Sequence, residues 1–361
     1  MTKGITEKKR LVGIDIIKAL SVFFVVVIHF YLNSAYYTAP LGGPNMFVQS
    51  YIRWIVLSGV PLFIMCTGYL NYKKEASASY YGKITSVIIP YAVISVICIA
   101  VKHFSGIEAF DFKKSLYSVF NFSADNYSWY VNMYIGLFLL APIFNYCIKN
   151  TDRRQLKNII IVLLVTVSLP STFNQIIFSD EKFQYFRFPE WWQNFYPVLF
   201  YFLGAYIAKY GLRVKKAVLA LIALVLPVIQ TAAQFVFCNK PNLDNWVFYN
   251  NGSLYFVIEA VCIFALLYSI EGKSNSCKKI LKTVSCSTLE IYLFSYLSDT
   301  FIYSYLKNAT GLPNNMNQQE FFIKYFALAV ILSFAISLAV SVAYKYIYGF
   351  AVNGIKKISV K

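Results

Sequence analysis

The stretch from Gly13 to Phe30 is long and apolar enough to cross a bilayer, yet it contains Asp15, Lys18 and His29. Ionisable side chains at membrane depth are energetically expensive, so they usually face the interior of a helical bundle and carry a function. Each residue of a helix turns by about 100°, and spacings of three and eleven residues therefore place all three side chains on one face. We expect this helix to form one wall of a site within the membrane.

The composition is that of a membrane domain and little else. Of the 361 residues, 58% are hydrophobic and 14% are charged, whereas a soluble domain carries about 25% charged residues. Apolar segments of spanning or near-spanning length follow one another, and no polar stretch between them is long enough for a soluble domain. The segments cover residues 11–31, 51–71, 84–104, 129–148, 158–178, 194–210, 213–237, 253–270, 286–306 and 322–349. We therefore expect an all-α fold, a single domain over residues 1–361 built as a bundle of ten transmembrane helices.

The net charge of +17 follows from topology. When the segments are numbered from a cytoplasmic N-terminus, most of the 33 Lys and Arg residues fall on the cytoplasmic side. All five tryptophans then fall on outer loops or the outer ends of spans, as an interfacial aromatic belt requires. We expect both termini in the cytoplasm, membrane lipids as the surroundings and no nucleic-acid partner.

The cysteines and histidines give no sign of a metal site. The seven cysteines show neither disulfide nor zinc spacing, and there are only two histidines, His29 and His103. The first apolar segment is too long and too charged for a cleaved signal peptide, so it is expected to remain as an anchor. An excess of Lys over Arg, with abundant Ile, Asn, Tyr and Phe, is typical of an AT-rich bacterial genome. We expect a multi-pass protein of a bacterial plasma membrane.

Four segments form a pattern along the chain. The opening helix has a basic residue, ten intervening residues and a histidine, here Lys18 and His29. The others are GVPLFIMCTGYLN (59–71), SWYVNMYIGLFLLAPIF (128–144) and STLEIYLFSYL (287–297). In this order and on these spans they resemble acyltransferase family 3, integral membrane proteins that move acyl groups, commonly acetyl, onto cell-surface glycans and related acceptors.

The chain departs from the family pattern at a few positions. Lys18 stands where the family more often has Arg, and Thr67 where it has Ser. Tyr127 and Ser128 precede the tryptophan of the third segment, where the family often has a histidine. Ser295 occupies the position of another family histidine. The resemblance leaves the histidine of the opening helix as the imidazole base.

Acyl transfer from a thioester to a hydroxyl needs a base for the hydroxyl proton and a site for the developing oxyanion. His29 suits the first role because imidazole titrates near neutral pH; its alternative is a histidine that merely holds helices together at the outer interface. Glu259 in the eighth span lies near the depth of His29 and can orient the imidazole, as the acid of a triad does. Asp299 in the ninth span is its rival, and a tyrosine is the alternative partner of Glu259.

Lys18 and His29 are too far apart to touch, about 16 Å along the helix axis. This length is comparable to an extended pantetheine arm. We expect acyl-CoA to enter from the cytoplasm with its phosphates near Lys18 and its thioester near His29. The alternative for Lys18 is an ion pair with Asp15 or Glu290, because a buried charge needs a partner in either case. For Asp15 we favour an i,i+3 pair with Lys18.

Two basic pairs on the cytoplasmic side are further candidates for the CoA phosphates, Lys73 with Lys74 and Arg153 with Arg154. Topology alone would place basic residues there, so this signal is weak. Acyl-CoA is expected as a donor substrate, with no permanently bound cofactor.

Three residues are candidates for contact with the acceptor. Arg53, at the outer end of the second span, can contact a polysaccharide or extend to the lipid headgroups. Thr67 and Ser295 can line the acceptor path, although hydrogen bonds between helices are the commoner role of such residues.

These residues predict a membrane O-acyltransferase that moves an acetyl or other short acyl group from cytoplasmic acyl-CoA to a hydroxyl of a cell-surface or lipid-linked glycan. Two alternatives lack this chemistry. One is a polysaccharide exporter, although transporters often have two related halves with interrupted spans and no such symmetry is visible here. The other is an accessory subunit that works with glycan-synthesis partners.

Overall fold

The computed structural model describes residues 10–177, 188–237, 251–271, 275–314 and 316–358. Every regular element in them is helical, which confirms the all-α class. The helices are α1 (Val12–Asn33), α2 (Gly43–Val56), α3 (Gly59–Asn71), α4 (Ala78–Tyr81), α5 (Thr85–Phe104), α6 (Phe112–Phe120), α7 (Trp129–Lys149), α8 (Arg153–Leu163), α9 (Leu169–Ile177), α10 (Tyr196–Tyr210), α11 (Lys216–Phe237), α12 (Leu254–Leu267), α13 (Asn275–Cys286), α14 (Thr288–Thr310) and α15 (Gln318–Ile358). Short 3₁₀ turns occur at Gly82–Ile84 and Glu190–Phe195, and a π-helical turn at Leu164–Ser168 joins α8 to α9.

Within these residues, seven helical stretches are long and apolar enough to cross a membrane, so the chain is a polytopic membrane protein. They are Val12–Asn33, Gly43–Asn71, Ala78–Phe104, Trp129–Lys149, Arg153–Asn174, Lys216–Val236 and Gln318–Phe350. The three other segments expected to span lie on α10, α12 and α14. α10 and α12 are short, with 15 and 14 residues, and α14 carries several charged side chains.

Local sequence signals fix several helix ends. The Asp152 side chain accepts a hydrogen bond from the backbone N–H of Gln155, whose side chain accepts one in return, a capping box that starts α8. Asp111 caps α6 in a similar way through the N–H of Lys114. Gly311 ends α14 in the left-handed conformation that glycine adopts most easily.

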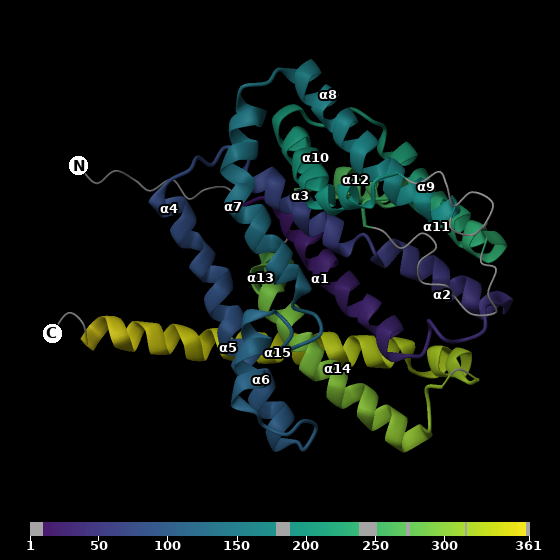
Figure 1. Cartoon of the computed structure of the whole chain (residues 1–361), viewed down its shortest axis with the longest axis vertical. Coiled ribbons are helices and arrows are strands. Elements are labelled where there is room, and N and C mark those ends of the chain that lie inside the picture. The colour runs from purple at the N-terminus through teal and green to yellow at the C-terminus, as the bar shows by residue number, and fades with distance from the viewer. Residues whose placement is uncertain (1–9, 178–187, 238–250, 272–274, 315, 359–361) are drawn as a thin grey trace.

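α1 lies at the centre of the bundle (Figure 1) and packs against α2, α3, α12, α13, α14 and α15. α14 and the long α15 pack against each other along one side of the molecule, and α8 to α12 gather on the opposite side (Figure 1). The polar face of α1 is therefore enclosed by other helices, as its charged residues require.

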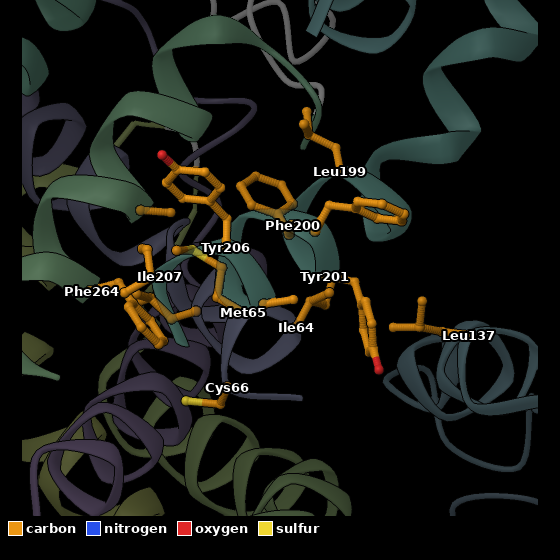
Figure 2. Packing of buried hydrophobic residues seen from close by; sticks show 14 of the residues in the cluster. Ile64, Met65, Cys66, Leu137, Leu199, Phe200, Tyr201, Tyr206, Ile207 and Phe264 are labelled. Atoms are coloured by element: carbon orange, nitrogen blue, oxygen red, sulfur yellow. The ribbon is translucent and has the colours of Figure 1, made fainter. Parts of the chain in front are cut away.

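The tightest helix pair is α3 with α10, and glycines allow the close approach. A Cβ on Gly68 would lie 2.1 Å from the carbonyl oxygen of Tyr201, and one on Gly204 would lie 2.0 Å from that of Met65. Small residues that let two backbones meet are typical of membrane helix pairs. Figure 2 shows Met65 and Tyr201 in the surrounding cluster of buried side chains, together with Phe264 of α12. This cluster packs α3, α10 and α12 together.

Candidate active site

His29 lies near the end of α1, buried with 4% of its surface exposed. Its Nδ1 is 3.3 Å from the Ser295 hydroxyl oxygen and 3.4 Å from Oδ2 of Asp299, both on α14. Its other face stacks on Tyr127, with ring centroids 3.5 Å apart and 21° between the planes. The imidazole is therefore fixed in position from two sides.

Asp299 accepts hydrogen bonds from two further elements, the turn before α7 and α15. Tyr127 donates its hydroxyl proton to Oδ2 at 3.0 Å, and Ser333 of α15 donates to Oδ1 at 2.5 Å. The Asn33 side chain donates to the Tyr127 hydroxyl at 3.1 Å and to the backbone carbonyl of His29. An ionised Asp299 would offset a positive charge on the imidazole.

The hydrogen bonds also determine which nitrogen of His29 is basic. The Ser295 hydroxyl donates its single proton to the carbonyl of Tyr292 at 2.7 Å. It must therefore accept from Nδ1–H, and the Asp299 carboxylate can only accept as well. This assignment, which rests on the hydrogen-bond network, leaves the lone pair on Nε2. Within the described residues, Nε2 makes no hydrogen bond, so it is free to take a proton.

The turn before α7 places Tyr127 against His29. Asp125 Oδ1 accepts a hydrogen bond from the Tyr127 backbone N–H at 2.8 Å, and Oδ2 accepts one from the Ser128 hydroxyl at 2.5 Å. Burial raises the pKa of the Asp125 carboxyl above its usual value. Asp125 was not predicted as a site residue, although an Asp three residues before the N-cap residue Ser128 is a recognisable turn signal. Asn33 and Ser333 were not predicted either, and the sequence offers no comparable signal for them.

Glu259 does not join this network. It is 1% exposed on α12, and in the described part of the chain neither carboxylate oxygen has a hydrogen-bond partner. Of the two acids considered as partners for His29, the structure brings Asp299 to the imidazole.

A cavity of about 240 Å³ runs beside α1 between α3, α5, α7 and α14. Lys18 and Thr67 line it, and so does Val25, which lies one turn before His29. Tyr292 lines the cavity as well, and its ring centroid is 6.4 Å from that of His29. The cavity therefore extends along α1 from Lys18 toward His29. Its wall also includes Phe63, Cys66, Tyr130 and Tyr134.

The ion pairs considered as the alternative role of Lys18 do not form among the described residues. Asp15 pairs with Arg10, which also donates to the Ser285 hydroxyl at 2.9 Å. Glu290 pairs with Lys345, with 3.2 Å between Oε2 and Nζ. The expected i,i+3 pair of Asp15 with Lys18 is thus replaced by contacts that tie α1 to α13. Among the described residues, Lys18 makes no ion pair and lies half-buried at the cavity wall.

The other basic candidates lie at separate places. Lys73 and Lys74 line a groove of about 570 Å³ together with Lys149. Arg153 lines another groove, of about 400 Å³. Arg154 is exposed at the start of α8. The structure does not bring these residues into the cavity that Lys18 lines.

Arg53 is fully buried, with 1% of its surface exposed, although the sequence placed it at a surface. Its guanidinium lies over the rings of Tyr36, Tyr37 and Trp54 at 5.9, 5.2 and 5.1 Å, and Nε donates to the Tyr37 hydroxyl at 3.2 Å. Thr67 donates to the backbone carbonyl one turn earlier while lining the cavity. No cluster of three metal-ligating side chains occurs within the described ranges.

The chain belongs to acyltransferase family 3: the family model described as "Acyltransferase domain" matches residues 11–342. This confirms the family expected from the four motifs, and membership indicates acyltransferase chemistry. Two proteins of Staphylococcus aureus, from strains MSSA476 and MRSA252, are each 23% identical over 259 residues. The match covers 66% of this chain and 68% of theirs, and each is named "Probable poly-beta-1,6-N-acetyl-D-glucosamine export protein". No solved structure matches this chain.

Proposed function

We propose that this protein is a membrane O-acyltransferase that moves an acetyl or other short acyl group from acyl-CoA to a hydroxyl of a cell-surface or lipid-linked glycan. The observation that carries the proposal is the hydrogen-bonding arrangement around His29. Ser295 and Asp299 hold its Nδ1 as the protonated nitrogen, which leaves Nε2 as a base.

The chemistry needs few steps. Nε2 of His29 takes the proton of an acceptor hydroxyl while the oxygen attacks the thioester carbonyl. The tetrahedral intermediate collapses with loss of CoA as thiolate, and the imidazolium returns its proton to the sulfur. Asp299 stabilises the positive imidazolium that exists between the two proton transfers. The ester bond to the acceptor replaces the thioester bond.

The cavity beside α1 fits the donor. Its length along the helix, from Lys18 toward His29, suits a pantetheine arm with the phosphates at Lys18. In the proposed topology of ten spans and two cytoplasmic termini, this end faces the cytoplasm of a bacterium and His29 lies nearer the outer face. Acyl-CoA is a substrate here and is not held permanently.

The donor site is tested with Lys18→Ala in the purified protein. Removing the ammonium is expected to weaken acyl-CoA binding by about ten-fold, since a charge-assisted contact to a phosphate is lost. Lys324→Ala, at an exposed position on α15 outside the cavity, is the control. Equal acyl-CoA affinity of Lys18→Ala and wild type would contradict this donor site.

Export of a polysaccharide is the second candidate function, because the Staphylococcus aureus relatives carry that name. An exporter, or an accessory subunit of a glycan synthase, would move or hold the polymer without acylating it. Export and acyl transfer both require contact with a glycan. They are distinguished by whether His29 takes part in the transfer of an acyl group.

Proton NMR of surface polysaccharides separates these functions. Cells that lack the protein are complemented with wild type or with His29→Ala. Acyl ester signals restored by wild type alone would support acyl transfer with His29 as the base. Equal restoration by both would remove His29 from that role. Identical acylation in all strains, with a change in the amount of surface polymer, would favour export.

A further inference from the structure

Two polar side chains outside the His29 network are buried without a hydrogen-bond partner among the described residues. Glu259 on α12 is 1% exposed, and Gln230 on α11 is 3% exposed. In the described residues, both carboxylate oxygens of Glu259 and both polar atoms of the Gln230 amide make no hydrogen bond. Burying such groups unsatisfied is costly, and native proteins seldom do so without a water or ligand.

Contacts between α11 and α12 give the direction of the two helices and place these two residues at a similar distance from one shared cluster. Toward one end of the helix pair, Ala233 of α11 and Phe256 of α12 belong to one hydrophobic cluster. Toward the other end, Leu219 of α11 packs with Cys262 of α12 in a second cluster. α11 and α12 are thus antiparallel, and one turn inward from the first cluster leads to Gln230 on α11 and to Glu259 on α12.

Trp54 of α2 belongs to the first cluster and contacts both α11 and α12. Its Nε1 donates to the side-chain oxygen of Gln234 at 3.0 Å, and its ring centroid is 5.6 Å from that of Phe256. Gln230 and Glu259 follow these two contacts by one helical turn, so they project to nearly the same side. Each unsatisfied polar group therefore lies one helical turn from a residue that contacts the indole ring of Trp54.

The hydrogen-bonding capacity of the pair limits the class of ligand. The carboxylate of Glu259 only accepts hydrogen bonds, whereas the Gln230 amide has two N–H donors and an accepting oxygen. A metal ion or an ammonium group would satisfy the acceptors and leave the amide donors without a partner. A hydroxyl group both donates and accepts, and the aromatic rings nearby offer an apolar surface to a sugar ring.

We propose that Glu259 and Gln230 form a second site, distinct from the His29 network, that binds hydroxyl groups of the glycan acceptor. The identity of the ligand as the acceptor rests on the proposed function. The cluster of Trp54, Leu57 and Phe256 borders this site, and Ile28, directly before His29, packs against the same cluster. One cluster of side chains thus separates the two sites. A glycan of several units can occupy the second site with one sugar and present another to His29.

The test is a calorimetric titration of the purified full chain in detergent, with a β-1,6-linked N-acetylglucosamine tetrasaccharide as the probe and no acyl donor. Glu259→Gln and Gln230→Leu are each expected to weaken binding by about ten-fold, the effect of losing one or two ligand hydrogen bonds. Glu320→Gln is the matched control, since Glu320 is exposed on α15 and pairs with Lys324. The monosaccharide should bind more weakly than the tetrasaccharide.

Size-exclusion and thermal unfolding profiles like those of wild type would show that each variant is folded, and Glu259→Gln preserves the side-chain shape. Unchanged affinity for the tetrasaccharide in both variants would overturn the proposal. The absence of saturable binding by wild type would overturn it as well, and would leave only water as the partner of these groups. Because the titration contains no acyl donor, its result is independent of acyl transfer. A cell experiment without acyl ester signals would contradict the proposed function and leave the binding result standing.

Discussion

Ser295 and Asp299 lie four residues apart on α14, and this spacing brings both side chains to the same nitrogen of His29. The motif resemblance predicts family histidines at the position of Ser295 and close to Tyr127. In the structure, Ser295 accepts the Nδ1–H of His29 and Tyr127 stacks on the imidazole. Both side chains thus position His29.

Asp299→Asn tests the positioning of the base. Asparagine can turn its amide N–H toward Nδ1 and favour the wrong tautomer of His29, so acyl transfer is expected to fall by about a thousand-fold or more. The measurement is the rate of acyl-CoA consumption with a glycan acceptor. In a His29→Ala background the same substitution should have little further effect, and additive losses would show that the two residues act independently.

Arg53→Lys tests the aromatic surroundings of the buried guanidinium. Lysine keeps the charge but loses planar stacking on the rings of Tyr36, Tyr37 and Trp54, so the free energy of unfolding should fall by about 1 kcal/mol. Unfolding in detergent by chemical denaturant measures the change. Arg154→Lys, at an exposed position on α8, should leave the free energy of unfolding unaltered. An equal decrease in that variant would indicate a general effect of replacing arginine with lysine.

At the scale of the elements, α3 and α10 meet backbone to backbone at two glycines. The contact is reciprocal, since Gly68 of α3 lies against Tyr201 of α10 and Gly204 of α10 lies against Met65 of α3. The same α3 supplies Cys66 and Thr67 to the cavity wall. A shift of α3 relative to α10 would therefore change the shape of the proposed donor site.

Gly68→Ala and Gly204→Ala are each expected to lower the free energy of unfolding by about 1–3 kcal/mol, because the new methyl group overlaps a backbone carbonyl. Thermal unfolding in detergent gives the measurement. Gly136→Ala is the matched control: it lies on α7 with no atom within 4 Å of the added Cβ. That variant should be as stable as wild type or slightly more so. A destabilisation equal to that of the other two would show that the close contact is not the cause.

At the scale of the molecule, the number of spans decides on which side of the membrane the chain ends. Ten spans return the C-terminus to the cytoplasm, whereas crossings by the seven long apolar stretches alone would leave it outside. α14 is not one of the seven long apolar stretches, because polar side chains such as Glu290, Ser295 and Asp299 interrupt its apolar sequence. Those side chains face partners inside the bundle, so its polarity agrees with a buried span.

Alkaline phosphatase, which is active only outside the cytoplasm, tests this topology. A fusion in the loop 105–128 should be active, and fusions in the loop 72–83 and after Lys361 should be inactive, because the basic loops remain inside. The C-terminal fusion separates the two span counts. Phosphatase activity there would contradict the proposal of ten spans.

The sequence by itself determined the helical class, the helices on which the apolar segments lie, the family and the face of α1 that carries Lys18 and His29. The family depends on the resemblance of four motifs, and the other features depend on hydropathy and on spacing along one helix; all of these can be read from a linear chain. Only the tertiary structure decided between Asp299 and Glu259. The sequence gives the depth of each acid in its own helix, but the direction in which it points depends on how α12 and α14 pack around α1. The burial of Arg53 and the contacts of Asn33, Tyr127 and Ser333 were decided in the same way, since residues distant in sequence meet only when the helices pack.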